Sequence, residues 1–249
     1  MLGNYITIDG VSSRTYGLFC KKLPVYPVAI EGFNPITVGG RLDSLHQASG
    51  HYNDIQVDIE AVLIGFDMDP IIQWFSSGKK LFMSNQPDKY AIIKQLVAID
   101  QKRTGNGALE LKITLKLSPF KYKLGDETID HNISPVVFKT TGNIYSEPLI
   151  LAKNCSDGFN MTLNGVTLTT SGLTGDIYID VPNRVVYQLV SGVRTVVNDH
   201  TSGEIWNLLL YPSETVNNTL SFAWANSIQI VKNERLTWTA SSSLWLYTG

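Results

Sequence analysis

The sequence has little cysteine and little charge, and each shortage excludes a class of protein. Only two cysteines, Cys20 and Cys155, occur in 249 residues. This excludes the disulfide framework of a small secreted domain, and we expect two buried free thiols. Charged residues make up 17% of the chain, and the 20 basic residues nearly balance the 22 acidic ones. A protein that binds nucleic acid normally carries a clustered basic face, so this composition argues against that class.

Long apolar runs are also missing. No stretch of 18 apolar residues is present to span a bilayer, so we expect no membrane insertion. The start, MLGNYITIDGVSS, lacks the basic stretch and apolar core of a secretory signal. We therefore expect the chain to be made and folded in a cytoplasm.

Helix patterns are scarce and strand patterns are abundant. The segment DMDPIIQWFSSG predicts one short helix near residues 69–77, with Asp69 as its cap and Pro70 at its first position. The sequence therefore predicts a mainly β fold with one short helix. Alternation or β-branched residues predict strands at 5–9, 54–66, 89–101, 108–117, 159–169, 176–181 and 184–190.

A long hairpin is predicted near residues 89–117, because two strand patterns flank the turn-forming KRTGNG. Its second arm places Leu and Ile at every other position and polar residues between them, which indicates one buried and one wet face. Such a ribbon either clasps a neighbouring subunit or forms an ordinary hairpin inside one sheet. The alternating residues are Leu109, Leu111, Ile113, Leu115 and Leu117 against Glu110, Lys112, Thr114 and Lys116.

The character of the chain changes after residues 124–134, a polar, turn-rich segment that Pro135 follows. No convincing helix pattern occurs beyond it. The stretch FKTTGNIYSEPLI, residues 138–150, then reads as the opening of a β-sandwich, because Pro148 suits the first position of a strand or a sheet edge. We predict two domains, residues 1–133 and 134–249.

Patterns for catalysis or metal binding are weak. No Gly-x-Ser-x-Gly elbow or phosphate-binding glycine loop is present. His46 and His51 fall in a predicted Gly-containing loop without a third ligand. Glu60, Asp100 and Glu110 are the carboxylates that a glycosidase would require, but nothing in the sequence sets their separation. We expect no enzyme, no catalytic residues, no metal and no cofactor.

Short motifs in a fixed order resemble those of a known family. They run from ITIDG and KKLPVYPVAIEGFN through ITVGGRLDSLHQASGHYNDIQVDIEAVLIG to LSPFKYK, and then to TTGNIYSEPLI, FNMTLNGVTL and DIYIDVPNRVVYQL. Together they span nearly the whole chain. The sequence resembles the distal tail protein (Dit) family of long-tailed, siphovirus-type bacteriophages of Gram-positive hosts.

This resemblance implies a β-sandwich-like N-terminal ring domain with a long hairpin and a galectin-like C-terminal β-sandwich. It also implies a hexameric ring, single or stacked in two, that joins the tail tube to the tail tip or baseplate. The implied partners are copies of the chain, the tail tube protein, the tape-measure protein, the tail-associated lysin or tip protein and receptor-binding proteins. DNA would pass through the ring without specific binding. The protein would be made in the host cytoplasm and reside at the distal tail of the virion.

The hairpin near 89–117 and the loop of residues 39–53 are the predicted ring contacts. The candidate interface residues are Arg41, Tyr52, Tyr90 and Lys94. Arg and Tyr are enriched at the energetic centres of interfaces. A turn-stabilising Arg41 and a half-buried Tyr52 are the alternative interpretations.

Two other functions fit parts of the sequence. Galectin-like sandwiches often bind sugars through exposed aromatic rings, so Trp206, Trp224, Trp238 and Trp245 raise the hypothesis of a carbohydrate-binding module. The apolar runs WNLLLY and LSFAWA instead favour core or strand-edge positions for Trp206 and Trp224. A wall-degrading enzyme is the third hypothesis, and it lacks a nucleophile or paired-acid motif.

Overall fold

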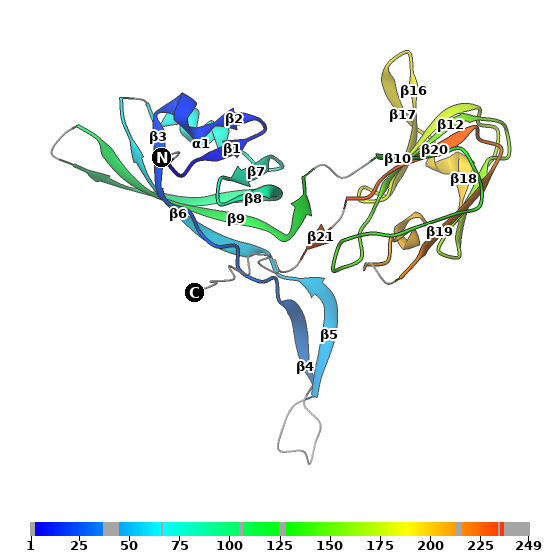
Figure 1. Cartoon of the computed structure of the whole chain (residues 1–249), viewed down its shortest axis with the longest axis horizontal. Helices are drawn as coiled ribbons and strands as arrows, with labels where there is room; N and C mark the ends of the chain where they lie inside the picture. Colours follow the sequence, from blue (N-terminus) through cyan, green and yellow to red (C-terminus); the bar gives the residue numbers. More distant parts are fainter. Residues whose placement is uncertain are drawn as a thin grey trace, which may run out of the picture. The chain divides into compact units, whose positions relative to one another are not determined.

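The protein is mainly β, as the sequence predicts, and its described residues form two compact units. The computed structural model describes residues 3–36, 45–65, 67–104, 107–124, 128–212, 216–233 and 235–236. The first unit runs to Leu124 and the second to Leu236 (Figure 1). β10 (Thr128–His131), which precedes the predicted boundary at residue 134, pairs with β20 (Ser227–Val231) inside the second unit.

One antiparallel sheet organises the first unit, in the order β2-β1-β7-β8-β9-β6-β3. The apolar residues of one face of this sheet form a continuous core with the short helix α1. The strands are β1 (Ile6–Ile8), β2 (Val11–Ser12), β3 (Leu18–Lys22), β6 (Ile55–Leu63), β7 (Lys80–Met83), β8 (Gln86–Arg103) and β9 (Leu109–Lys123), with a 3-10 turn η1 (Ser13–Tyr16) after β2.

The predicted long hairpin is present as β8 and β9, and it lies inside this sheet. β7 pairs with the start of β8, and β6 pairs with β9. The β8–β9 pairing shifts register three times between Ala91 and Ala98. Such bulges bend a strand and increase its twist, so the long hairpin curves around the core. Within one chain, therefore, β8 and β9 form an ordinary hairpin inside one sheet, which is one of the two predicted alternatives.

The predicted alternation along β9 is correct from Leu111 to Leu117 except at Thr114, whereas Leu109 and Glu110 are both half-buried. Leu111, Ile113, Leu115 and Leu117 are buried, whereas Lys112 and Lys116 are exposed. Thr114 belongs to the polar side, yet only 7% of it is exposed, because its hydroxyl donates a hydrogen bond across the strands, as described below.

The predicted helix is present as α1 (Asp69–Trp74), but its cap is not the expected one. Asp69 is the first helical residue, and the cap position is Met68, whose side chain makes no capping hydrogen bond. The Asp67 carboxylate instead accepts a hydrogen bond from the Met68 backbone amide at 2.7 Å. The helix buries Ile71 and Trp74 in the core.

The predicted loop of residues 39–53 is wrong from Leu45 onward, because residues 45–52 form a strand. β5 (Leu45–Tyr52) pairs with β4 (Glu31–Ile36), and the two make a separate two-stranded ribbon of the first unit (Figure 1). Residues 45–48 and Tyr52 pair with β4, and Ser49 and Gly50, whose strand preference is low, fall in the register shift between Ala48 and Tyr52. His46 and His51 thus lie on a strand rather than in a loop.

The second unit is a sandwich of two antiparallel sheets around one apolar core. The larger sheet has the order β10-β20-β12-β15-β16-β17 and the smaller β11-β19-β13-β14-β18. The remaining elements of these sheets are β11 (Val136–Phe138), β12 (Leu149–Cys155), β13 (Asn160–Leu163), β14 (Val166–Thr170), β15 (Gly175–Asp180), β16 (Val185–Val190), β17 (Val193–Val196), β18 (Thr201–Ser202) and β19 (Asn218–Ala223), with 3-10 turns η2 (Asn198–His200) and η3 (Ile205–Asn207). The short strand β21 (Arg235–Leu236) belongs to neither sheet of the sandwich.

Two local predictions in the second unit can be compared with the structure. Pro148 stands immediately before β12, a position where a missing backbone amide removes no ladder bond. The sequence predicts one strand over 159–169, but this segment is the β13–β14 hairpin. Asn164 and Gly165 both have positive φ, which is the geometry of a two-residue hairpin turn.

Candidate functional site

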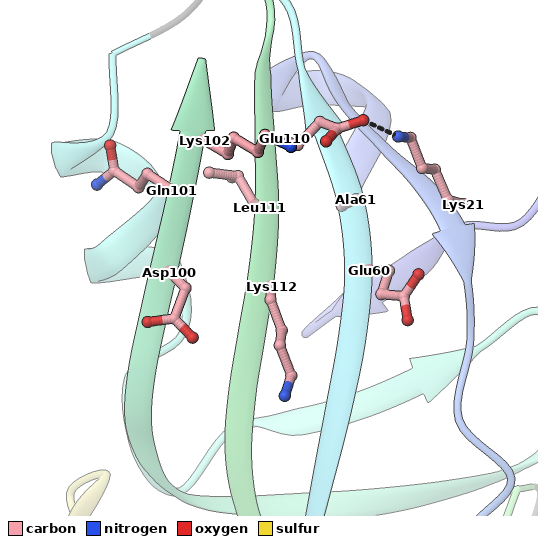
Figure 2. Close-up of a pocket in the computed structure, with 9 residues that line it drawn as sticks. All are labelled: Lys21, Glu60, Ala61, Asp100, Gln101, Lys102, Glu110, Leu111 and Lys112. Atoms are coloured by element: carbon pink, nitrogen blue, oxygen red, sulfur yellow. Dashed lines mark hydrogen bonds and ion pairs between the residues drawn. The ribbon is translucent and has the colours of Figure 1, made fainter. Parts of the chain in front are cut away.

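The outward side of β6, β8 and β9 in the first unit carries a dense set of charges, which we call the polar face. A shallow groove of about 290 Å³ runs across it (Figure 2). Small-molecule pockets are mostly apolar, so this charged groove is atypical of them. The polar face comprises Lys21 of β3, Asp54 beside β6, Asp58 and Glu60 of β6, Glu110, Lys112, Thr114 and Lys116 of β9, and Asp100 and Lys102 of β8.

The strand register places opposite charges side by side on this face. Lys112 is the direct partner of Glu60 on one side and of Asp100 on the other. Figure 2 shows Lys112 between these two carboxylates. One row along, Glu110 is the direct partner of Lys102. Directly opposite pairs are close enough to interact, so Lys112 lies between carboxylates of both neighbouring strands.

Ion pairs and a hydrogen bond fix these contacts. Lys112 Nζ lies 3.0 Å from Asp58 Oδ2, and Lys116 Nζ lies 3.5 Å from Asp54 Oδ2. The Thr114 hydroxyl donates to Asp58 Oδ1 at 2.7 Å. On the β3 side, Lys21 forms an ion pair with Glu110.

The electrostatics of the polar face oppose acid catalysis. The Thr114 hydroxyl and the Lys112 ammonium lower the pKa of Asp58, and Lys21 lowers the pKa of Glu110. Asp58, Asp100 and Glu60 raise the pKa of Lys112. A glycosidase needs a carboxyl whose pKa is raised so that it can donate a proton at neutral pH. The three carboxylates considered from the sequence, Glu60, Asp100 and Glu110, do share this groove, but Lys112 and Lys102 lie between them.

The sheet of the first unit has a long open edge along the second half of β8. The last backbone hydrogen bonds on its outer side join Ile93 to Gly78 and Lys79. Among the described residues, positions 94–103 pair only with β9. Val97 on this edge is 47% exposed. An open edge of this length is a template for pairing with another strand.

The opposite side of the sheet ends at β3 and at the extended segment 23–30, which the sequence analysis did not single out as a contact. Val25, Val28 and Ile30 in this segment are 78%, 57% and 66% exposed. The prolines of the motif LPVYPVAI were the available signal, because proline in a strand-like run is confined to edges.

Buried residues of the same segment hold it against the unit. Tyr26 is 4% exposed, and the Lys121 ammonium of β9 lies 5.3 Å from the centre of its ring. Burial lowers the pKa of Lys121, and Lys89 adds to this effect. Asn85 also donates a side-chain hydrogen bond to the Pro24 carbonyl at 3.0 Å. The exposed apolar row is therefore presented by an anchored backbone.

The surface of the second unit carries exposed or partly exposed aromatic groups. Tyr178 and Tyr187 stack with ring centres 4.9 Å apart, and the Arg194 guanidinium lies 4.0 Å from the centre of the Tyr187 ring. Trp206 is 51% and Trp224 64% exposed, so of the two predicted positions, core or strand edge, the core is wrong for both. Trp206 lies in the 3-10 turn η3, and Trp224 directly follows the last residue of β19. Trp238 and Trp245 lie outside the described residues.

Comparison with known proteins gives one informative result. No protein-family model matches the sequence, and no curated protein matches it. Four chains of solved structures do match. One is the crystal structure of the SPP1 Dit protein, described as a paradigm of the hub adsorption apparatus in Gram-positive infecting phages. The two chains are 14% identical and superpose with a TM-score of 0.65, covering 91% of this chain and 97% of that chain.

The chain has the Dit fold. At this identity the likeness concerns the fold, and the roles of individual residues must come from their own surroundings.

The predicted contact residues occupy different parts of this Dit fold. Tyr52 ends β5 and is half-buried, with its ring centre 5.2 Å from that of Phe120. Tyr90 is half-buried in β8 and stacks on Tyr122 at 5.3 Å. Lys94 is exposed and is the first residue of the open β8 edge. Arg41 lies outside the described residues. Their part in an interface stays a prediction.

Groups that could hold a metal or perform redox chemistry do not gather in the described ranges. Cys20 and Cys155 are free and buried, as predicted. Burial raises the pKa of both thiols, that of Cys155 to about 12, so neither is a ready nucleophile. Among the described residues no cluster of three His, Cys, Asp or Glu side chains could ligate a metal, and no helix could span a membrane.

Proposed function

We propose that this protein is a structural component of a phage tail, a hub that assembles from copies of itself into a ring at the distal end of the tail tube. The observation that carries this proposal is the likeness to the SPP1 Dit protein over almost the full length of both chains. Agreement across both units, rather than in one common sandwich, makes a shared architecture a better account than the chance reuse of one fold.

The open edges of the first unit supply the surfaces that a ring requires. A closed ring uses heterologous contacts, in which one patch of a subunit meets a different patch of the next. The β8 edge and the edge formed by β3 with segment 23–30 are two such patches, at opposite sides of the strands β8-β9-β6-β3.

Strand direction makes these two edges compatible. Neighbouring strands from β8 to β3 are all antiparallel, so β3 runs antiparallel to β8. When rotation about a ring axis brings β8 of one copy to β3 of the next, the new pair is antiparallel as well. Val97 on one edge and Val25, Val28 and Ile30 on the other would lose exposed apolar surface in that contact.

The remaining parts of the proposal assign roles to the two units. The first unit forms a hexameric ring around the DNA channel, either one ring or two stacked. The second unit lies outside that ring and offers attachment to other tail proteins. The partners are the tail tube and tape-measure proteins and the lysin or receptor-binding proteins of the tip. This role requires no catalysis, in keeping with the compensated charges of the polar face.

Native mass measurement of the purified full chain tests the proposal. We expect a species of six or twelve subunits, with a concentration-dependent equilibrium toward the single chain. Immunogold labelling of virions should place the protein at the tail end that lacks the head. A chain that stays monomeric at high concentration and labels no part of the tail would contradict the proposal.

A carbohydrate-binding role for the second unit is a second candidate, favoured by its exposed aromatic rings. Trp206, Trp224 and the stacked Tyr178 are suited to pack against a sugar ring. A glycan array probed with the full chain tests it. Binding that is lost in Trp206→Ala or Trp224→Ala but kept in Val193→Ala would support a sugar site, and the absence of any bound glycan would leave the hub role alone.

A further inference from the structure

The ion pairs of the polar face follow a column pattern. The β9 column carries the cations Lys112 and Lys116, and the β6 column beside it carries Asp54, Asp58 and Glu60. On the other side of β9, Asp100 of β8 is the direct partner of Lys112. Lys112 and Lys116 therefore each have a carboxylate within reach on the β6 side.

Stability does not explain this arrangement. The side chains of Lys112 and Asp58 are 54% and 43% exposed, and those of Lys116 and Asp54 are 47% and 31% exposed. Exposed ion pairs of this kind contribute about 0–1 kcal/mol each, and often nothing measurable. Polar residues without charge would serve as well on a wet sheet face, so the alternation of full charges points to the field that the face presents to its surroundings.

We propose that this lattice of ion pairs keeps the polar face from binding nucleic acid, so that the face can serve as the wall along which a DNA duplex moves. The inference rests on the proposed ring function, because only a channel gives the face a polyanion to meet. The other face of the sheet is packed in the core. If the open edges join into a ring with this sheet as its inner wall, the polar face is the one that lines the channel.

The ion pairs avoid two opposite effects, retention of the DNA duplex and its repulsion. Lysines without partners would each take a phosphate and hold the duplex by releasing its counterions. A face of carboxylates alone would repel the duplex from the opening. Pairing Lys112 with Asp58 and Lys116 with Asp54 leaves a wall that is polar and wet but has no net site for phosphate.

The test removes the β6 carboxylates and keeps the shapes of their side chains. In the variant Asp54→Asn/Asp58→Asn/Glu60→Gln, the amide oxygen introduced at position 58 can still accept the Thr114 hydrogen bond, while Lys112 and Lys116 lose the carboxylates with which they form ion pairs and Lys112 keeps only Asp100 beside it. We expect its affinity for a fluorescein-labelled random duplex, measured by anisotropy at low salt, to rise roughly tenfold or more over the parent. The affinity should fall with salt with a log–log slope of about 2, about one unit for each of the two lysines released.

Two controls separate this effect from a general change in charge. The variant Asp157→Asn/Asp199→Asn/Glu204→Gln makes the same change in net charge on the second unit and should bind DNA no better than the parent. Adding Lys112→Gln and Lys116→Gln to the first variant should return it to the parental level. If the two triple variants bind the duplex equally well, the masking role is overturned.

Native mass spectra of every variant keep the two proposals apart. If the protein forms a ring, but the Asp54→Asn/Asp58→Asn/Glu60→Gln variant gains no more affinity for the DNA duplex than the control variant, the proposed role of the ion pairs is overturned and the hub function is unaffected. If the protein is a monomer, but the Asp54→Asn/Asp58→Asn/Glu60→Gln variant binds DNA and the added lysine substitutions abolish this binding, the ion pairs do prevent DNA binding and the ring proposal is overturned.

Discussion

The two units differ in how their sheets end. The second unit closes its larger sheet with β10 and β17, each 4 residues long, and its smaller sheet with β11 and β18, of 3 and 2 residues. Short edge strands discourage pairing with other chains. The first unit instead leaves residues 94–103 of β8 open, and an anchored, apolar segment follows β3 on the opposite side. Self-association is therefore expected of the first unit and not of the second.

The two units also differ in how their charged side chains interact. In the first unit, charges pair across strands in rows on one open face. In the second unit, Asp180 accepts hydrogen bonds from Asn183 in its own turn and lies 3.4 Å from Arg194, which packs on the Tyr187 ring. The first arrangement controls a surface field, whereas the second fixes local loops and leaves aromatic rings available for contact.

The largest expected effect tests whether the two units are separate folding bodies. Leu115 and Leu220 are fully buried in the first and second core. Leu115→Ala should lower the stability of the first unit, and Leu220→Ala that of the second, by about 2–5 kcal/mol each, because each leaves a cavity. Urea unfolding followed by circular dichroism and by tryptophan fluorescence checks this. One merged transition shifted equally by both variants would show a single cooperative body.

The next effect concerns the edges. Val97→Lys places a charge on the open β8 edge and should weaken subunit association by about 1–3 kcal/mol per contact, enough to lose the ring at micromolar concentration. Val193→Lys makes the same change on β17, where the parent residue is 66% exposed, and should leave the ring intact. Analytical ultracentrifugation compares the two. Equal loss in both variants would remove the distinction between the edges.

A smaller expected effect is a dependence of the stability of the second unit on pH. Burial lowers the pKa of His131 below its ordinary value, partly opposed by Asp130, with a further lowering by Lys232. The neutral imidazole thus stabilises the fold above about pH 6.5, and this contribution is lost as the pH falls. We expect the second unit to weaken by less than about 1 kcal/mol between pH 7 and 5, and His131→Leu to remove that slope. The first transition serves as the internal control.

The smallest expected effect is the pH dependence of the stability of the first unit. The Thr114 hydroxyl and Lys112 lower the pKa of Asp58, so the carboxylate stabilises the fold above about pH 4 and loses this contribution as the pH falls further. Thr114→Val should cost less than about 1 kcal/mol at pH 7, a value discounted for the exposure of Asp58, and almost nothing of this loss should remain at pH 2. Thr114→Ser, which keeps the hydroxyl, should behave like the parent. A loss independent of pH would mean that packing, not the hydrogen bond, is responsible.

Patterns with a period of two were predictable, and features that depend on distant segments were not. The alternation of β9 appeared in the sequence because each apolar residue at 111, 113, 115 and 117 enters the same core. Residues 45–52 read as a loop because Ser49 and Gly50 have weak strand preference. Only the pairing of residues 45–48 and Tyr52 with β4, on either side of a register shift that contains Ser49 and Gly50, makes the segment a strand. Trp206 and Trp224 lie in apolar runs yet are exposed. The apolar character of neighbouring residues does not decide whether a side chain is buried, because burial depends on how the strands pack.

By itself the sequence determined the mainly β class, the single short helix, the long hairpin and the wet and buried sides of β9, because these follow from local periodicity and turn chemistry. Only the tertiary structure decided that Glu60, Asp100 and Glu110 share one face with Lys112 and Lys102 between them, and that β8 ends in an open edge. Strand order and register set these features. They arise from pairing between segments far apart in the chain, whose spacing no local pattern records.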